Sequence, residues 1–210
     1  MKLIIAIDPG ASGGIAKMEM NTGVVTAMAM PEDADLRDMF ENIKAEYGND
    51  LVCYLEQVGG YIGVPQPGSY MFNFGDGFGY IRGIVDAMRI RRIMVRPQVW
   101  QKGIPGVVPK MKGAERKRAL KEYAARLYPN EKVTLKTADA LALLEYARRV
   151  EGLPPMPDPV TNVVYENNYR SDARAAVKWC KAKGHAVPQK SSKEFLTMVN
   201  FWVKEVRDAK

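Results

Sequence analysis

The stretch that decides the fold is LIIAIDPGASGG, residues 3–14. Its five consecutive apolar residues, 3–7, are typical of a strand that is buried on both faces of a sheet. Asp8 follows directly, and the proline and glycines of residues 9–14 favour a tight turn at this point. The stretch therefore predicts a core strand that ends in a carboxylate.

Outward from this turn, hydrophobic periodicity predicts an α/β domain with five strands. Period-two patterns and turn residues mark the strands, and apolar residues at helical spacing mark the helices. The expected strands are 3–7, 14–20, 24–30, 51–55 and 91–96, and the expected helices are 36–47, about 74–89, 115–127 and one that begins at Thr137. The segment from Pro97 to Gly113 is expected to be irregular, because it holds three prolines and three glycines.

Two further carboxylates stand at the ends of predicted elements. Glu56 follows the fourth strand, one strand–helix unit after Asp8. If these two strands are parallel neighbours, both carboxylates emerge at the same edge of the sheet. Asp139 lies in the first turn of the helix that begins at Thr137, where a carboxylate is electrostatically favoured. The sequence thus predicts three acids at the ends of core elements.

A shared cluster of carboxylates has a defined chemistry. Two of them about 4 Å apart repel by roughly 4 kcal/mol at an effective dielectric near 20, so the cluster needs a proton or a cation. With oxygen ligands only, that cation is Mg²⁺ or Mn²⁺. Paired hard cations suit the attack of water on a phosphodiester. The predicted reaction is therefore phosphodiester hydrolysis.

Length and composition exclude several other classes of protein. The chain has 210 residues, of which 47% are hydrophobic and 26% charged, and these proportions exclude a disordered or fibrous chain. No apolar run reaches 18 residues, so we expect a soluble protein of the cytoplasm. Cys53 and Cys180 have no metal-ligand spacing and are expected to be reduced core thiols. The single histidine, His185, is expected at the surface.

Charge is distributed unevenly along the chain. The formal net charge is +7, yet residues 1–80 hold 4 basic and 11 acidic side chains, whereas residues 81–126 hold 13 basic and 3 acidic ones. Residues 159–210 hold 10 basic and 5 acidic side chains. Such clusters form either solvated helix faces or a surface that follows a phosphate backbone beside a carboxylate site, and the second interpretation predicts a nucleic-acid partner.

Four prolines between residues 154 and 159 predict a stiff linker. We therefore expect three parts in the chain. These are a domain at 1–152, a proline-rich linker at 153–160, and a small basic helical module at 161–210 with helices near 172–182 and 194–206.

Five segments in this order resemble the RuvC-like Holliday junction resolvases of the ribonuclease H-like superfamily, particularly the branch from bacteriophages. The segments that carry the resemblance are IAIDPG (5–10) with Gly13-Gly14, LEQ (55–57), GYIRG (79–83), RPQVWQK (96–102) and KTADALA (136–142). Together they cover about residues 1–152, which we expect to be a ribonuclease H-like nuclease domain.

This resemblance implies a five-stranded mixed sheet flanked by helices and a homodimer with two active sites. It also implies an Mg²⁺-dependent endonuclease of DNA recombination and repair, in a bacterial cytoplasm or, for a phage-encoded chain, in that of the host. Such an enzyme nicks opposed strands of branched DNA: four-way junctions, or alternatively forks or flaps. Two Mg²⁺ ions are expected in each site, with Mn²⁺ as a substitute.

By the same resemblance, Asp8 is the acid shared by both metals, and Glu56 and Asp139 are the flanking ligands. Lys136 stands where some relatives have a carboxylate. Because it lies three residues before Asp139, it is expected to orient water or screen the scissile phosphate, or else to be a solvated surface lysine.

Nucleic-acid contacts are expected from an aromatic side chain and from the basic segment. The aromatic that opens the junction is Tyr61, Tyr70 or Phe72, with a core position as the alternative for Phe72. Trp100 is expected in the core. The basic side chains expected on the DNA backbone are Lys102, Lys110, Lys112, Arg116, Lys117 and Arg118.

Two other functions remain open at this point. One is a DNA-binding or architectural protein without nuclease activity, which would need only the basic surface. The other is a phosphate-binding domain of the actin-like ATPase type, because those proteins also begin with an Ile-Asp-x-Gly strand and turn. They need two such folds facing a cleft, and only one strand–turn of this kind occurs here.

Overall fold

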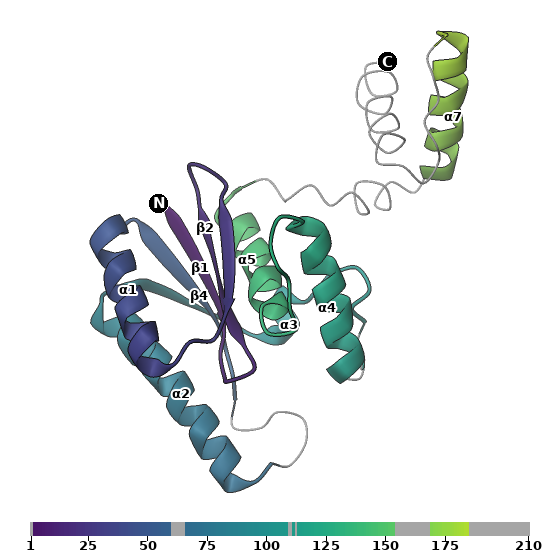
Figure 1. Cartoon of the computed structure of the whole chain (residues 1–210). Helices are drawn as coiled ribbons and strands as arrows, with labels where there is room; N and C mark the ends of the chain where they lie inside the picture. Colours follow the sequence, from purple (N-terminus) through teal and green to yellow (C-terminus); the bar gives the residue numbers. More distant parts are fainter. Residues whose placement is uncertain (1, 60–65, 109–110, 112, 154–168, 185–210) are drawn as a thin grey trace. The chain divides into compact units, whose positions relative to one another are not determined.

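In the computed structural model, a five-stranded mixed sheet lies at the centre of the N-terminal part of the chain (Figure 1). Strands β1, β2 and β3 are antiparallel, whereas β1, β4 and β5 are parallel. The strands are β1 (Leu3–Asp8), β2 (Gly14–Glu19), β3 (Val25–Ala29), β4 (Leu51–Glu56) and β5 (Arg91–Val95), in the order β3-β2-β1-β4-β5. Helices cover both faces, which confirms the predicted five-stranded mixed sheet flanked by helices.

Two helical layers enclose this sheet (Figure 1). On one face lie α1 (Asp33–Tyr47) and α2 (Gly68–Ala87), and on the other lie α3 (Pro97–Trp100), α4 (Gly113–Leu127) and α5 (Ala138–Val150). Successive residues of a strand point to opposite faces, so every residue of β1 is buried: odd-numbered apolar residues pack toward α1 and α2, even-numbered ones toward α4 and α5. Because both faces of β1 are covered by helices, residues 3–7 are all apolar.

Some element boundaries differ from those predicted. Helix α2 begins at Gly68 rather than near Phe74, and Tyr70 stacks on Phe74 one turn later, with ring centroids 6.3 Å apart. Glycine has poor helix propensity and α2 contains five glycines, so the contact between two aromatic side chains four residues apart helps to stabilise this helix. The short helix α3 occupies the start of a segment that the sequence predicts to be irregular, and proline at its first position suits a helix start.

The structure describes residues 2–59, 66–108, 111, 113–153 and 169–184. The chain divides into two compact units, Met1–Met156 and Pro157–Lys210. In the second unit, α7 (Tyr169–Ala182) buries Ala176 and Cys180. The predicted helix at 194–206 and His185 lie outside the described residues, as does most of the predicted linker.

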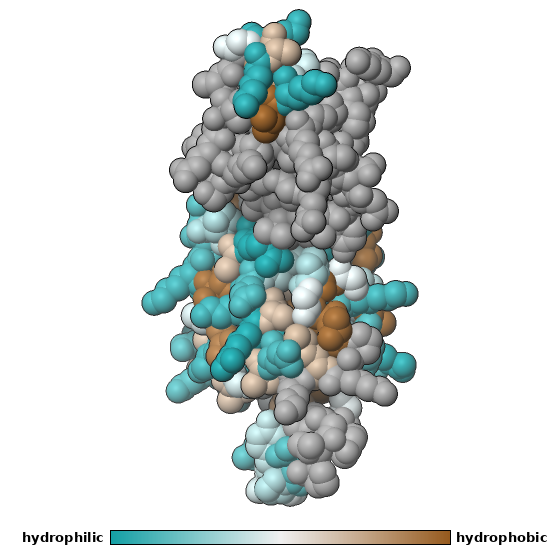
Figure 2. Space-filling view, turned by 90° about the vertical axis from the view of Figure 1, so that its right-hand side faces the viewer, coloured by the Kyte–Doolittle hydropathy of each residue, from teal (hydrophilic) through white to brown (hydrophobic). Residues whose placement is uncertain are grey.

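Both cysteines are free and buried, as predicted. Within the described part of the chain, no helix combines the length and the apolar character that crossing a membrane requires. Figure 2 views the first unit from the side on which α4 lies in Figure 1, and shows hydrophilic side chains interspersed with hydrophobic ones.

Candidate functional site

Asp8 and Glu56 end two neighbouring parallel strands. Ile7 of β1 pairs with Leu55 of β4, so the next residue of each strand, Asp8 and Glu56, stands at the same level of the sheet. Both continue the even-numbered alternation, which faces α4 and α5. The local fold therefore delivers two carboxylates to one edge and one face of the sheet, as the sequence predicted for parallel neighbours.

Helix α5 brings the third acid to this face. It packs across β1 and β2, and Asp139 lies buried in its first turn. Close approach is possible because Gly14 of β2 has no side chain: a Cβ there would lie 2.6 Å from the backbone oxygen of Lys136, just before the helix. Gly14 pairs with Asp8 across the ladder, so the same contact sets the start of α5 beside the end of β1.

The three carboxyl groups act on one another electrostatically. Burial raises the pKa of Asp8 well above its ordinary value, and the charges of Glu56 and Asp139 raise it further. Burial and Asp139 together raise the pKa of Glu56 to about 7. Burial also raises the pKa of Asp139. The structure therefore places Asp8, Glu56 and Asp139 within electrostatic reach of each other, in surroundings that disfavour their ionised forms.

Trp100 holds Glu56 in place, a role that sequence reasoning missed. Its indole Nε1–H donates a hydrogen bond of 2.9 Å to Glu56 Oε2, and the ring is 1% exposed, which confirms the predicted core position. This bond favours the charged carboxylate and so opposes the rise in the pKa of Glu56. The sequence carried one signal for this contact. Trp100 follows shortly after a predicted strand, and a buried indole N–H needs a hydrogen-bond partner.

Arg116 and Lys117 face the acids from α4. Their charges lower the pKa of Asp8, Glu56 and Asp139, although burial outweighs them. Both residues are half-buried, and both were predicted as contacts to the DNA backbone. The site thus has an acidic centre at the sheet edge and a basic flank on α4.

The donor set suits a hard divalent cation. All three acids offer carboxylate oxygens, and Oδ1 of Asp139 is buried without a hydrogen-bond partner in the described part of the chain. Among the described residues, however, no group of three or more His, Cys, Asp or Glu side chains stands in an arrangement ready to hold a metal ion. The acids are neighbours, but the structure does not assemble them into a closed ligand set.

The other predicted site residues occupy varied positions. Lys136 is exposed and lies in the turn that leads into α5, where the Ala138 N–H donates a hydrogen bond to the Thr134 carbonyl. Phe72 is 73% exposed, so its alternative as a core residue is wrong. Lys102 and Arg118 are exposed, and Tyr70 is 48% exposed. Outside the described residues lie Tyr61, Lys110 and Lys112.

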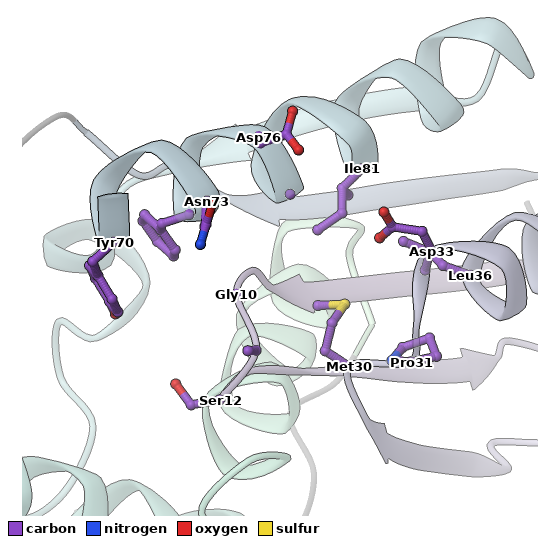
Figure 3. A pocket seen from close by; sticks show the side chains of 13 residues that line it. Gly10, Ser12, Met30, Pro31, Asp33, Leu36, Tyr70, Asn73, Asp76 and Ile81 are labelled. Atoms are coloured by element: carbon purple, nitrogen blue, oxygen red, sulfur yellow. The ribbon is translucent and has the colours of Figure 1, made fainter. Parts of the chain in front are cut away.

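A cavity of about 600 Å³ lies on the opposite face of the sheet, between α2 and the turn that follows β1 (Figure 3). Gly10 adopts φ +102° there, and a Cβ on it would lie 2.8 Å from the ring of Phe74. Asp33 and Asp76 are the ionisable side chains, apart from Tyr70, that line it. Because its charges are acidic, this cavity does not suit a phosphate-bearing ligand.

Comparison with known proteins gives structural similarities only. No protein-family model and no curated protein matches the chain. RuvC of Thermus thermophilus in complex with a Holliday junction substrate is 12% identical, covers 74% of this chain and 99% of its own, and has a TM-score of 0.47. A second structure of that RuvC is 14% identical over 73% and 98% of the two chains, with a TM-score of 0.44.

The Holliday junction resolvase of fowlpox virus is 13% identical, over 71% of this chain and 99% of its own, with a TM-score of 0.41. At sequence identities of 12 to 14%, these three similarities describe the backbone fold and not the side chains of the site.

Proposed function

We propose that this chain is a metal-dependent, structure-specific endonuclease that cuts phosphodiester bonds in branched DNA, with four-way junctions as its principal substrate. The observation that carries the proposal is the electrostatic coupling of Asp8 with Glu56 and Asp139 at one edge of the sheet. Arg116 and Lys117 lie beside them and provide positive charge for a phosphate backbone.

In this proposal, Asp8, Glu56 and Asp139 are the metal ligands, with Mg²⁺ or Mn²⁺ as the ion. A bound divalent ion would supply charge stabilisation for the attacking and leaving oxygens of the phosphodiester. Trp100 fixes one oxygen of Glu56 through its hydrogen bond, and this limits the rotation of that carboxylate. Lys136, exposed at the approach to α5, screens or orients groups at the scissile phosphate.

The DNA surface in this proposal extends from the acids along the basic side of the first unit. Lys102, Arg116, Lys117 and Arg118 contact phosphates there. Lys110 and Lys112 are proposed as further phosphate contacts, and Tyr61, with Tyr70 and Phe72 as alternatives, as the aromatic that opens the junction. Such contacts give salt-sensitive binding that follows branched shape more than base sequence. We further propose a homodimer, because paired nicks in opposed strands need two active sites, and an added DNA contact from the basic residues at 161–210.

The test is cleavage of a synthetic four-way junction in Mg²⁺ and in Mn²⁺. The wild-type chain should cut it, whereas Asp8→Asn should bind it and leave it intact. The matched control is Asp50→Asn, an exposed aspartate just before β4, at the opposite end of that strand from Glu56, and this variant should cut normally. A wild-type chain that binds the junction but never cuts it would contradict the nuclease and support a DNA-binding protein without catalysis.

Light scattering of the free protein and of its junction complex tests the dimer. Two copies on one junction are expected. A strict monomer in both states would contradict paired nicking, although single nicks would then still support the nuclease.

A further inference from the structure

A second cavity opens beside the candidate site, between α3, the segment that follows it, and the start of α4. Its volume is about 450 Å³, and we call it the α3–α4 pocket. The lining residues used below are Gln98, Gln101, Lys102, Val107, Met111 and Arg116.

The α3–α4 pocket and the acids share two structural parts. Arg116 lines the pocket and also acts electrostatically on Asp8 and Glu56. Helix α3 presents Gln98 to the pocket, while Trp100 of the same helix is bonded to Glu56. Arg116 and helix α3 therefore connect the pocket with the acids.

The side chains of the pocket match the parts of a nucleotide. Each of Gln98 and Gln101 carries an amide with donors and an acceptor, the combination that reads the edge of a base. Val107 and Met111 provide apolar surface for the flat face of a base. Lys102 and Arg116 provide positive charge for the adjoining phosphate. No acidic residue is among the described residues that line the pocket.

One atom in the pocket lacks a hydrogen bond. Nε of Arg116 is buried and has no hydrogen-bond partner among the residues that the structure describes. A buried donor of this kind is costly to leave unsatisfied, and an acceptor on a bound nucleotide would satisfy it. This observation is independent of the pocket's shape and favours a ligand rich in acceptor oxygens or nitrogens.

We propose that the α3–α4 pocket receives one unpaired nucleobase of the DNA strand held at the acids, and that Gln98 and Gln101 read its edge. The pocket then gives the nuclease a preference for a particular base beside the cut. This inference rests on the proposed function for its substrate, but it assigns a base-reading site that the three acids and the basic surface do not contain.

The experiment compares the cut sites of a pool of four-way junctions with all four bases at each position around the branch. The wild-type chain should prefer one base at a single position by roughly 5- to 100-fold, the range expected for readout of a base edge. The double variant Gln98→Ala/Gln101→Ala should cut with that preference reduced at least fivefold. The control is Val99→Ala, an exposed residue of the same helix outside the pocket, and it should keep the preference.

A second measurement does not need cleavage. A junction with the fluorescent adenine analogue 2-aminopurine at the preferred position, or at each branch position in turn, is bound in Ca²⁺ without Mg²⁺. Fluorescence should rise when the wild-type chain unstacks the base, and should not rise with the double variant.

The two measurements separate failure of the inference from failure of the proposed function. Cutting by the wild-type chain with no base preference, or with a preference that the double variant retains, overturns the pocket and leaves the nuclease standing. A wild-type chain that never cuts but shows the variant-sensitive fluorescence rise keeps the pocket and overturns the nuclease. If the wild-type chain shows neither a base preference in cleavage nor a rise in 2-aminopurine fluorescence, the assignment of the α3–α4 pocket as a base-reading site is overturned.

Discussion

Replacement of Glu56 by glutamine tests the electrostatics of the site most directly. The new amide side chain would keep the shape of the glutamate and accept the hydrogen bond of Trp100, but it would not titrate. In the wild-type chain, burial and the charge of Asp139 raise the pKa of Glu56 from 4.5 to about 7. The folded pKa lies above the unfolded one, so the unfolded chain releases this proton first, and the free energy of unfolding falls as pH rises between these values.

The size of the effect follows from this pair of pKa values. Each unit of difference corresponds to about 1.4 kcal/mol, so Glu56 lowers the free energy of unfolding by about 1 kcal/mol at pH 5 and about 3 kcal/mol at pH 8. Glu56→Gln should therefore gain about 2 kcal/mol relative to the wild-type chain between pH 5 and pH 8. Loss of one negative charge also eases the ionisation of Asp8, which adds to the gain.

The assay is urea unfolding of both proteins at pH 5 and pH 8 in buffer that contains EDTA. Glu122→Gln, at an exposed position of α4, serves as the control and should show no such gain. Addition of Mg²⁺ at pH 8 should stabilise the wild-type chain more than Glu56→Gln, because the ion replaces the missing counter-charge. If the free energies of unfolding of Glu56→Gln and the wild-type chain differ by the same amount at both pH values, the raised pKa of Glu56 is refuted.

Three further substitutions test the contacts around the acids. Trp100→Phe removes the hydrogen bond to Glu56, so the pKa of Glu56 should rise in an NMR titration of the metal-free protein; an unchanged pKa would count against that bond. Gly14→Ala places a methyl group against the backbone oxygen of Lys136, and should lower the free energy of unfolding by about 1 to 3 kcal/mol in urea, whereas an unchanged midpoint would contradict the close packing. Arg116→Gln should weaken junction binding and lower the slope of log K against log salt by about 0.9, and an equal slope would remove Arg116 from the DNA surface.

The sequence was sufficient for the sheet because its information there is local. Five apolar residues before Asp8, and the same pattern before Glu56, identify strands buried on both faces. Parallel pairing then places both acids at one edge. The start of α2 was not readable, because Gly68 and the glycines after it have poor helix propensity, and only the stacking of Tyr70 on a ring one turn later reveals the helix.

The details of the site depend on contacts between distant segments. The bond from Trp100 to Glu56 joins residues 44 positions apart, and no periodicity encodes it. The effect of Arg116 on the acids depends on how α4 lies against the sheet. Lys136 lies in the turn that leads into α5, where the Ala138 N–H donates to the Thr134 carbonyl and Thr137 has helical φ and ψ. Its predicted place beside Asp139 depends on where its exposed side chain points, and so its role stays a prediction.

Positive and negative charge at this site have linked consequences for the proposed nuclease. Arg116 and Lys117 lower the pKa values of the three carboxyl groups, and so relieve part of the cost of their burial. When the phosphates of a DNA strand pair with these two side chains, that relief weakens, and the phosphates add negative charge of their own. The acids then attract a divalent cation more strongly, so DNA and metal should bind with positive cooperativity, each raising the affinity of the other by the same factor.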